Sequence, residues 1–368
     1  MIKVLSIFGT RPEAIKMAPL VKELERRSEI ESVVCVTAQH REMLDQVLKV
    51  FDIRPDYDLN IMKQGQTLTE ITSRVLDGLE YVIKDVKPDI VLVHGDTTTS
   101  FAGALAAFYN QTAIGHVEAG LRTYDKYSPW PEEMNRQMVD CMTDMYFAPT
   151  ELSKENLLSE GKDEDKIYVT GNTAIDAMNT TISHDYSHEA LNFIDDNDRL
   201  ILLTAHRREN IGENMRHIFT AIKRIVDDEP NVKVIYPIHL NPKVRETANE
   251  VFGNTRKVKL IEPLDVFDFH NFEEKAYLIM TDSGGIQEEA PSLGKPVLVL
   301  RNTTERPEGI DAGTLKLVGT NEDVIYEEAM KLLRDEEEYK AMAKAKNPYG
   351  DGHASERIAE AIIEKFNK

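Results

Sequence analysis

The stretch Tyr277–Gly294 reads YLIMTDSGGIQEEAPSLG, and it indicates the fold more directly than any other segment. Its apolar start predicts a buried parallel strand, Thr281–Ser283 predicts a polar turn, and the residues from Ile286 predict a helix. The start of a helix carries unpaired N–H groups and a positive dipole end, which attract anions. The segment is therefore either an anion-binding turn or an ordinary strand–turn–helix of an α/β domain.

Two glycines stand where this helix begins. Gly284 and Gly285 have no side chains, so a phosphate could approach the backbone closely. Glu289 follows about one helical turn later, where it could reach a group attached to that phosphate, and a carboxylate there suits a ribose diol. The segment thus suggests a nucleotide diphosphate, with Ser283 at the turn.

Composition narrows the class of protein. The chain has 368 residues, of which 41% are hydrophobic and 29% charged, as expected of a globular protein with two domains. The net charge of −20 argues against nucleic acid and anionic membranes as partners. A strand pattern opens the chain, without a signal peptide or a long apolar run, so we expect a cytoplasmic protein. Cys35 and Cys141 lack metal or redox spacing, and we expect both to be buried.

Short β-rich runs alternate with helical patterns along the chain, which predicts parallel sheets with right-handed crossovers. The pattern weakens over 172–199 and then restarts. We therefore expect two doubly wound Rossmann-like domains facing across a cleft, the first over 1–171 and the second over 172–353. The last helix, within 354–368, could pack on either domain, including back on the first.

Ligands of open parallel sheets bind beyond the carboxyl ends of the strands. Any single polar residue there could be structural: Asp96 could cap the next helix, and an isolated His206 would be an ordinary histidine. The joint pattern in both halves instead predicts one cleft between the domains. The residues at these ends are Gly9–Arg11, Gln39–His40, Asp96 and Glu118, then His206–Arg207, His239, Glu262 and Asp282–Ser283.

Two helix starts carry further candidates. Arg11 and Lys16 are cations near a helix N-terminus, where a bound phosphate would offset their conflict with the dipole, although Lys16 could also lie on a solvated face. Glu132 and Arg136 are four residues apart and share a helix face after the Pro-Trp-Pro turn. A surface ion pair is the alternative, and it suits Glu133 better than Glu132.

Eight segments together resemble the non-hydrolysing UDP-N-acetylglucosamine 2-epimerases, and they follow the order of that family over nearly the whole chain. They are GTRPEAIKMAP at 9–19, VHGDTTTS at 93–100, HVEAGLR at 116–122, PEEMNR at 131–136, TAHRREN at 204–210, HLNP at 239–242, TDSGGIQEEAPSLGKP at 281–296 and RNTTERPE at 301–308.

The resemblance implies a fold of the glycosyltransferase B type and reversible interconversion of UDP-GlcNAc and UDP-ManNAc, with no metal and no NAD. It also implies a homodimer. By motif, it implies acid/base roles for Asp96, Glu118 and Glu132, and cleft roles for Arg136 and His206. The implied UDP ligands are Arg11, Lys16, His206, Ser283, Gly284, Gly285 and Glu289, and the candidates for a second, activating UDP-GlcNAc pocket are Gln39, Arg207 and His239.

The chemistry favours expulsion of UDP, because the proton on C2 of the sugar has no neighbouring carbonyl to acidify it. Loss of UDP from C1 and of the C2 proton gives a glycal, to which UDP adds back. Crowding of the three acids would raise the pKa of at least one of them. Three rivals stay open: a UDP-sugar glycosyltransferase, a hydrolysing epimerase that releases ManNAc and UDP, and a nucleotide-sugar sensor.

Overall fold

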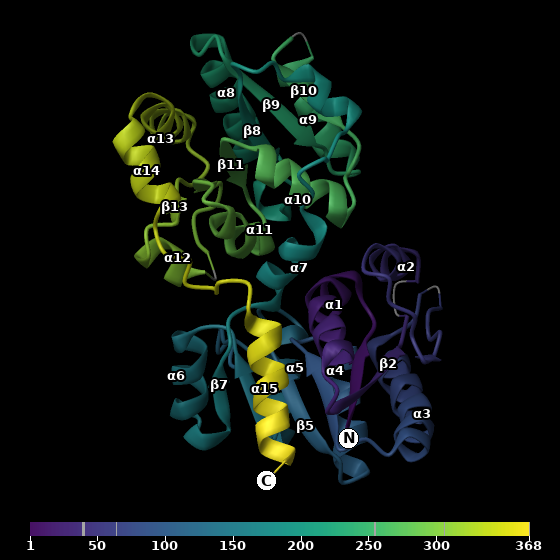
Figure 1. The fold of residues 1–368 in the computed structure, drawn as a ribbon. Coiled ribbons are helices and arrows are strands. Elements are labelled where there is room, and N and C mark those ends of the chain that lie inside the picture. Colours follow the sequence, from purple (N-terminus) through teal and green to yellow (C-terminus); the bar gives the residue numbers. More distant parts are fainter. Residues whose placement is uncertain (39–40, 64, 254, 305, 368) are drawn as a thin grey trace. The chain divides into compact units, whose positions relative to one another are not determined.

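The computed structural model describes residues 1–38, 41–63, 65–253, 255–304 and 306–367. The chain forms two compact units, which we call unit 1 (Met1–Thr180 with Tyr349–Lys368) and unit 2 (Thr181–Pro348). Each contains one parallel sheet with helices between its strands (Figure 1). The predicted α/β class with two Rossmann-like domains is confirmed.

Unit 1 has a seven-stranded sheet in the order β3-β2-β1-β4-β5-β6-β7, and every pairing is parallel. Its strands are β1 (Ile2–Phe8), β2 (Ile30–Val36), β3 (Tyr57–Asp58), β4 (Ile90–His94), β5 (Ala113–Val117), β6 (Met145–Ala148) and β7 (Ile167–Val169). Its helices are α1 (Arg11–Arg26), α2 (Arg41–Val50), α3 (Leu68–Val86), α4 (Thr98–Tyr109), α5 (Glu132–Met142), α6 (Glu151–Ser159), α7 (Thr173–Thr181) and α15 (Ala354–Phe366).

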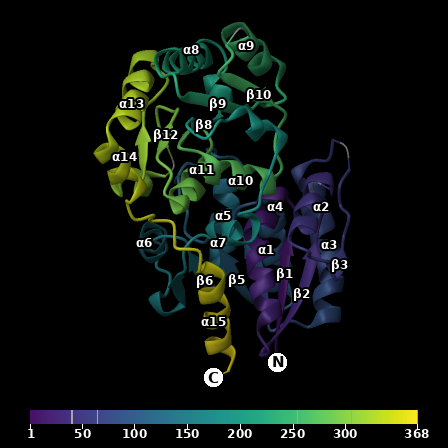
Figure 2. The same ribbon diagram turned by 45° about the horizontal axis from the view of Figure 1, so that its top comes forward.

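Unit 2 has a six-stranded parallel sheet in the order β10-β9-β8-β11-β12-β13. Its strands are β8 (Arg199–Thr204), β9 (Val232–Pro237), β10 (Val258–Ile261), β11 (Leu278–Thr281), β12 (Val297–Val299) and β13 (Leu315–Leu317). Its helices are α8 (Glu213–Asp228), α9 (Pro242–Phe252), α10 (Val266–Lys275), α11 (Gly284–Glu289), α12 (Pro307–Asp311), α13 (Glu322–Arg334) and α14 (Glu336–Ala343). Figure 2 shows α13 and α14 near β12.

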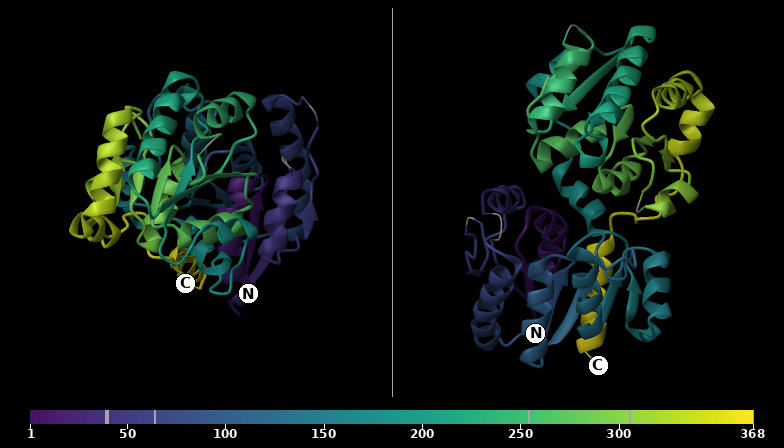
Figure 3. Two further views of the ribbon diagram at one scale, coloured as in Figure 1. Left: turned by 90° about the horizontal axis from the view of Figure 1, so that it is seen from above. Right: turned by 180° about the vertical axis from the view of Figure 1, so that it is seen from behind.

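The strands of unit 2 are buried on both faces, because successive side chains point to opposite sides of a sheet. Ile201 and Leu203 belong to the core cluster that contains α8, α9 and α13 residues. Leu200 and Leu202, between them, belong to a second cluster with α10 and α11 residues. Helices therefore cover both faces of this sheet, as the two views of Figure 3 allow the reader to follow.

Helix α7 was not predicted, since the region 172–199 looked polar and irregular. Its apolar residues are nevertheless buried in unit 1, and Asp176 accepts hydrogen bonds from the backbone N–H groups of Ala354 and Ser355. Those two residues open α15, which packs against α1. The division of the chain therefore lies one helix beyond the predicted boundary at residue 172, and the C-terminal stretch of unit 1 begins at Tyr349 rather than at residue 354.

Two further observations concern the chain as a whole. No helix among the described residues has the length and apolar character that a membrane crossing requires. Cys35 is buried as predicted, but Cys141 is exposed, so that part of the prediction was wrong. Cys141 lies near the end of α5, where its side chain is exposed.

Candidate active site

The order of the strands in unit 1 reverses between β1 and β4, where the chain leaves the sheet in opposite directions. Such a switch point opens a crevice at the carboxyl ends of the strands. The turn after β1 is shaped by a capping box: Thr10 accepts from the N–H of Glu13, and the Glu13 carboxylate accepts from the N–H of Thr10 at 2.7 Å. Arg11 follows as the first residue of α1 and is half-buried.

Asp96 follows β4, and its Oδ2 accepts a hydrogen bond from the guanidinium of Arg136 on α5. Its backbone carbonyl accepts a second bond from the amide of Asn135, at 2.9 Å. Thr97, rather than Asp96, caps α4, since its hydroxyl accepts from the N–H of Ser100 at 3.0 Å. The Asp96 side chain is therefore left to face Arg136, and the alternative of a helix cap is wrong.

Glu118 follows β5 and has a positive φ of 67°, a conformation that costs energy for a residue with a side chain. Its Oε1 forms an ion pair with Lys16 from α1 and accepts from the amide of Asn172 at 3.4 Å. The side chains of Glu118 and Lys16 are only 10% and 15% exposed. Lys16 therefore does not lie on a solvated face; it compensates a nearly buried carboxylate.

Two buried groups adjoin these carboxylates. Nε2 of His94 lies 3.9 Å from Oε2 of Glu118. Burial lowers the pKa of His94 to about 4, although Glu118 opposes that shift, so the imidazole is neutral near pH 7. Glu13 accepts hydrogen bonds from the hydroxyls of Thr97 and Ser100 at 2.6 and 3.0 Å, and burial raises its pKa. Glu13 therefore ties the turn after β1 to the turn after β4.

Glu132 opens α5 and is half-buried, but Arg136 makes its ion pairs with Asp96 and Glu133 rather than with Glu132. Glu133, expected on the surface, is fully buried. It accepts hydrogen bonds from the N–H groups of Thr123 and Tyr124, both at 3.0 Å. Glu133 thus anchors the loop that precedes α5, which sequence spacing could not reveal.

The predicted crowding of the three acids stays a prediction, while the described contacts give the partners of two of them. Asp96 meets the cation of Arg136, and Glu118 meets the cation of Lys16. Each of these two carboxylates therefore contacts a cation. Glu132 lies one helical turn before Arg136 on the same face of α5, close to this group by position.

In unit 2, Asp282 organises the ends of β8 and β11, the switch point of the second sheet. Its fully buried Oδ2 accepts from the N–H groups of His206 and Arg207 at 2.9 Å each, and from the Asn210 amide at 3.0 Å. Three donors thus converge on one carboxylate oxygen of Asp282. Asp282 therefore fixes the turn that presents His206 and Arg207.

His206 lies over a cavity of about 190 Å³ at the ends of β8, β9 and β11. Its ring is stacked on that of His239, with centroids 5.6 Å apart, and its Nδ1 lies 3.2 Å from Oδ1 of Asp282. Burial lowers the pKa of His206, against the pull of Asp282. The lining is mostly apolar: Thr204, Ala205, Pro237, Pro263, Leu264, Phe269 and Ile286 accompany His206, His239 and Ser283.

The glycine turn has two cations close to it. A Cβ atom added to Gly284 would lie 3.8 Å from a guanidinium nitrogen of both Arg207 and Arg306, and one added to Gly285 would lie 3.7 Å from Oε1 of Glu289. Small residues there leave room between the backbone and these charges. Arg306 was not among the predicted site residues; the RNTTERPE segment was the only signal for it.

One group of side chains could hold a metal ion by geometry. The ligand atoms of His270, Glu273 and Glu289 lie within 4.8 Å of one another. Glu273 is fully buried, and neither of its oxygens has a hydrogen-bond partner. Burial, and then the charge of Glu289, raise the pKa of Glu273 well above 4.5. A protonated Glu273 is a poor ligand, so the arrangement favours a proton over a cation.

The structure thus brings some predicted residues together and separates others. Asp96 joins Arg136, and Glu118 joins Lys16, within unit 1. His206, His239 and Ser283 line one cavity of unit 2, although His206 and His239 were assigned to two different predicted pockets. Arg207 lies beside Gly284. Gln39 lies outside the described residues. The residues that sequence reasoning missed are Glu13, His94, Asn172, Glu133 and Arg306. Two of them had a signal in the sequence: Glu13 in the capping spacing after Thr10, and Arg306 in the RNTTERPE segment.

Comparison with known proteins bears on what this arrangement does. The family model described as UDP-N-acetylglucosamine 2-epimerase matches residues 22–363. The chain belongs to this family. A UDP-N-acetylglucosamine 2-epimerase of Bacillus subtilis is 64% identical, over 98% of this chain and 95% of the relative. Members of this epimerase family are isomerases.

Two solved structures extend the comparison. A Listeria monocytogenes protein is 60% identical with a TM-score of 0.96, covering 100% of this chain and 97% of its own. The UDP-GlcNAc 2-epimerase of Neisseria meningitidis, solved bound to UDP-GlcNAc, is 52% identical with a TM-score of 0.89, covering 99% and 100%. The epimerase therefore shares its glycosyltransferase B-type fold with these relatives over its whole length.

Proposed function

We propose that the protein interconverts UDP-GlcNAc and UDP-ManNAc by reversible epimerisation at C2 of the sugar, with no added cofactor. The observation that carries the proposal is the pair of carboxylate–cation contacts, Asp96 with Arg136 and Glu118 with Lys16, at neighbouring strand ends of unit 1. Family membership supports the reaction, and the Neisseria relative bound to UDP-GlcNAc supports the substrate.

The proposed route is elimination and re-addition. The bond from C1 to the diphosphate oxygen breaks, its electron pair leaves with UDP, and a base removes the C2 proton as the C1–C2 double bond forms. The intermediate is 2-acetamidoglucal. A proton then returns to C2 from the other face, and UDP adds to C1. Positive charge that develops at C1 needs a nearby carboxylate, and proton transfer needs a group on each face.

Asp96, Glu118 and Glu132 are the proposed acid/base groups, and Arg136 donates a hydrogen bond to Asp96. His94, whose pKa is lowered by burial to about 4, lies beside Glu118, with Nε2 3.9 Å from Oε2. Kinetics of variants at the three acids would show which one removes the proton and which one returns it.

The proposed UDP site uses the glycine turn of unit 2. Ser283, Gly284 and Gly285 would hold the diphosphate, aided by Arg207 and Arg306, whose guanidiniums lie near Gly284. The cavity beneath His206 suits a flat base, because its lining is largely apolar. Glu289 would bind the ribose. Arg11 and Lys16 are further proposed ligands of the diphosphate.

Gln39, Arg207 and His239 remain the proposed contacts for a second, activating UDP-GlcNAc molecule. We also propose a homodimer in the cytoplasm. Sedimentation velocity of the purified protein tests the dimer, and a monomer over the assay concentrations would refute it.

The decisive experiment follows the products of UDP-GlcNAc by NMR, with no acceptor, metal or NAD added. Formation of UDP-ManNAc until equilibrium supports the proposal. Release of free ManNAc and UDP would indicate a hydrolysing epimerase. Binding without turnover would indicate a sensor, and turnover only after an acceptor is added would indicate a glycosyltransferase.

The same assay in D2O tests the route. Elimination predicts deuterium at C2 in both the product and the recovered substrate, because the removed proton exchanges with solvent. Complete retention of the original hydrogen at C2 would rule the glycal route out.

A further inference from the structure

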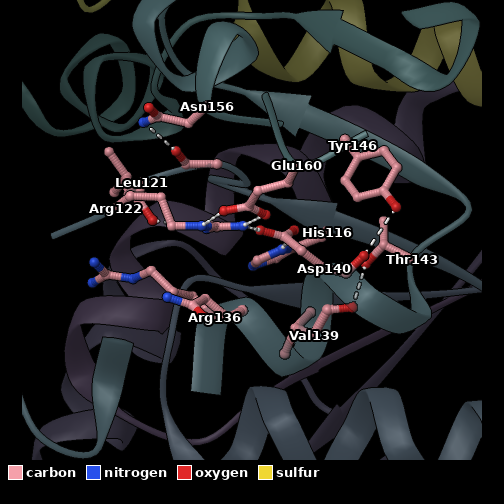
Figure 4. Close-up of polar contacts among 12 residues, drawn as sticks. His116, Leu121, Arg122, Arg136, Val139, Asp140, Thr143, Tyr146, Asn156 and Glu160 are labelled. Atoms are coloured by element: carbon pink, nitrogen blue, oxygen red, sulfur yellow. Dashed lines mark hydrogen bonds and ion pairs between the residues drawn. The ribbon is translucent and has the colours of Figure 1, made fainter. Parts of the chain in front are cut away.

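His116 on β5 is fully buried and makes two short contacts, one from each ring nitrogen. Nε2 lies 2.8 Å from the carbonyl oxygen of Gly95. Nδ1 lies 2.6 Å from Oδ1 of Asp140, and Figure 4 shows these two side chains next to each other. A carbonyl oxygen only accepts hydrogen bonds, so Nε2 must carry a proton. The charge on His116 then depends on the state of Asp140.

Asp140 is an ionised carboxylate. Burial opposes its ionisation, but His116 and Arg122 outweigh that effect and lower the pKa of Asp140. Oδ2 accepts from the guanidinium of Arg122 at 2.6 Å, and Arg122 also makes two bonds to Glu160, at 2.6 and 2.8 Å. Figure 4 shows Arg122 between these two carboxylates. With both Asp140 oxygens accepting, Nδ1 of His116 must donate as well.

We propose that His116 is a buried imidazolium that acts as a positioning residue: it clamps the Gly95 carbonyl and the Asp140 carboxylate, and so holds α5 against the turn that carries Asp96. The inference rests on the proposed function for its catalytic consequence. The network balances two cations, His116 and Arg122, against two anions, Asp140 and Glu160, which permits a buried charge.

The clamp acts on the turn after β4. Gly95 has a positive φ of 64°, and its N–H donates to the carbonyl of Val117 at 2.9 Å. His116 holds the carbonyl of the same residue, and Asn135 holds the next carbonyl, that of Asp96. The backbone on both sides of Asp96 is thus fastened to β5 and α5. Glu118 follows Val117 on β5, so the contacts of Gly95 with His116 and Val117 also hold Glu118 at a fixed position relative to Asp96.

The clamp also sets the position of α5. Glu132, Arg136 and Asp140 are spaced by four and share one face of this helix. Asp140 is bound to His116 and Arg136 to Asp96, so two successive turns of α5 are tied to the strand ends. A shift of α5 would therefore move Arg136 and Glu132 relative to Asp96. Displacements of about 1 Å at such groups lower turnover by about 100-fold.

Two further groups near His116, Tyr146 and His94, neither bind its imidazole nor place a second positive charge beside it. His116 pairs in the sheet with Val93 on β4 and Tyr146 on β6. The hydroxyl of Tyr146 donates to the backbone carbonyl of Asp140 at 2.9 Å rather than to the imidazole. His94 on β4 interacts electrostatically with His116, and its lowered pKa keeps His94 neutral.

The first test is NMR of the wild-type protein labelled with 15N-histidine. We expect proton-coupled signals from both ring nitrogens of His116, because each nitrogen donates to an acceptor. In Asp140→Asn the amide can donate to Nδ1, and we expect a neutral ring protonated only at Nε2. A single protonated nitrogen in the wild type would overturn the imidazolium, whatever the protein catalyses.

The second test separates positioning from folding. We expect His116→Gln to lower kcat by about 10- to 100-fold while KM changes less than about threefold, because the binding groups stay but the reacting groups shift. Asp140→Asn keeps the shape of the side chain and should also lower kcat. This variant provides the test if His116→Gln does not fold. His217→Gln, on the exposed face of α8, is the control and should leave kcat unchanged.

Two outcomes distinguish the inference from the proposed function. If the wild type does not epimerise UDP-GlcNAc, the function fails, while the NMR result still decides the charge of His116. If the wild type is active and both variants keep kcat within about twofold, the positioning role is refuted and the function stands.

Discussion

Arg136 donates a hydrogen bond to the Asp96 carboxylate, although the two residues are 40 positions apart in the chain. The contact joins the helix that carries Glu132 to the strand end that carries Asp96. A carboxylate that a neighbouring donor fixes in place is suited to proton transfer, and the first prediction follows from this.

Replacement of the carboxylates tests their proposed roles. We expect Asp96→Asn, Glu118→Gln and Glu132→Gln each to lower kcat by about 100-fold or more, as acid/base groups do. The measurement is initial-rate kinetics in both directions, with solvent deuterium incorporation to show which variants still remove the C2 proton. Asp77→Asn, an exposed residue of α3, is the control. Near wild-type turnover in all three variants would refute the assignment.

His94 predicts a pH-dependent stability. Its folded pKa is about 4, below the ordinary value of 6.5, so the unfolded chain binds the proton more readily and stability is lost as the pH falls from 6.5 towards 4. The lost free energy of unfolding between about pH 7 and pH 5 is about 2 kcal/mol. We expect His94→Asn to remove this part of the acid sensitivity in urea unfolding curves. An unchanged pH slope in the variant would contradict the prediction.

Glu273 predicts the opposite slope. Its folded pKa is raised well above 4.5, so the folded state retains a proton that the unfolded chain releases, and stability falls as the pH rises above 4.5. We expect Glu273→Gln to abolish that loss and to increase the free energy of unfolding near neutral pH by about 1–3 kcal/mol. Thermal unfolding of both proteins from mildly acidic to alkaline pH measures this difference in stability. Glu327→Gln, on the exposed face of α13, should show no pH-dependent gain.

Glu133 predicts a loop that depends on one buried side chain. Glu133→Ala leaves the N–H groups of Thr123 and Tyr124 without their acceptor, which costs about 1–3 kcal/mol per unsatisfied buried donor. We expect faster proteolysis within 121–131 and a lower kcat, since the same loop leads into Glu132. Limited proteolysis with mass mapping measures the first effect. Protection equal to the wild type would show that the loop is held by other contacts.

Much of the site could be predicted, because its residues stand at the carboxyl ends of strands with clear apolar patterns. Asp96, Glu118, His206 and Asp282 were all located in this way, and the glycine turn was recognised from its strand–turn–helix pattern. Helix α7 and the buried Glu133 could not be predicted. Their polar side chains mask burial in a linear pattern, and only packing against distant elements shows it.

The sequence by itself determined the alternation of strands and helices, the turns that carry the site residues, and the family, because these depend on local periodicity, glycines and short motifs. Only the tertiary structure decided the partners. Lys16 meets Glu118 across 102 residues, Arg136 meets Asp96 rather than Glu132, and His116 is enclosed by two acceptors. Such pairings follow from the order of strands in the sheet, which brings distant segments to one edge. The spacing of these residues along the sequence does not reveal which of them meet.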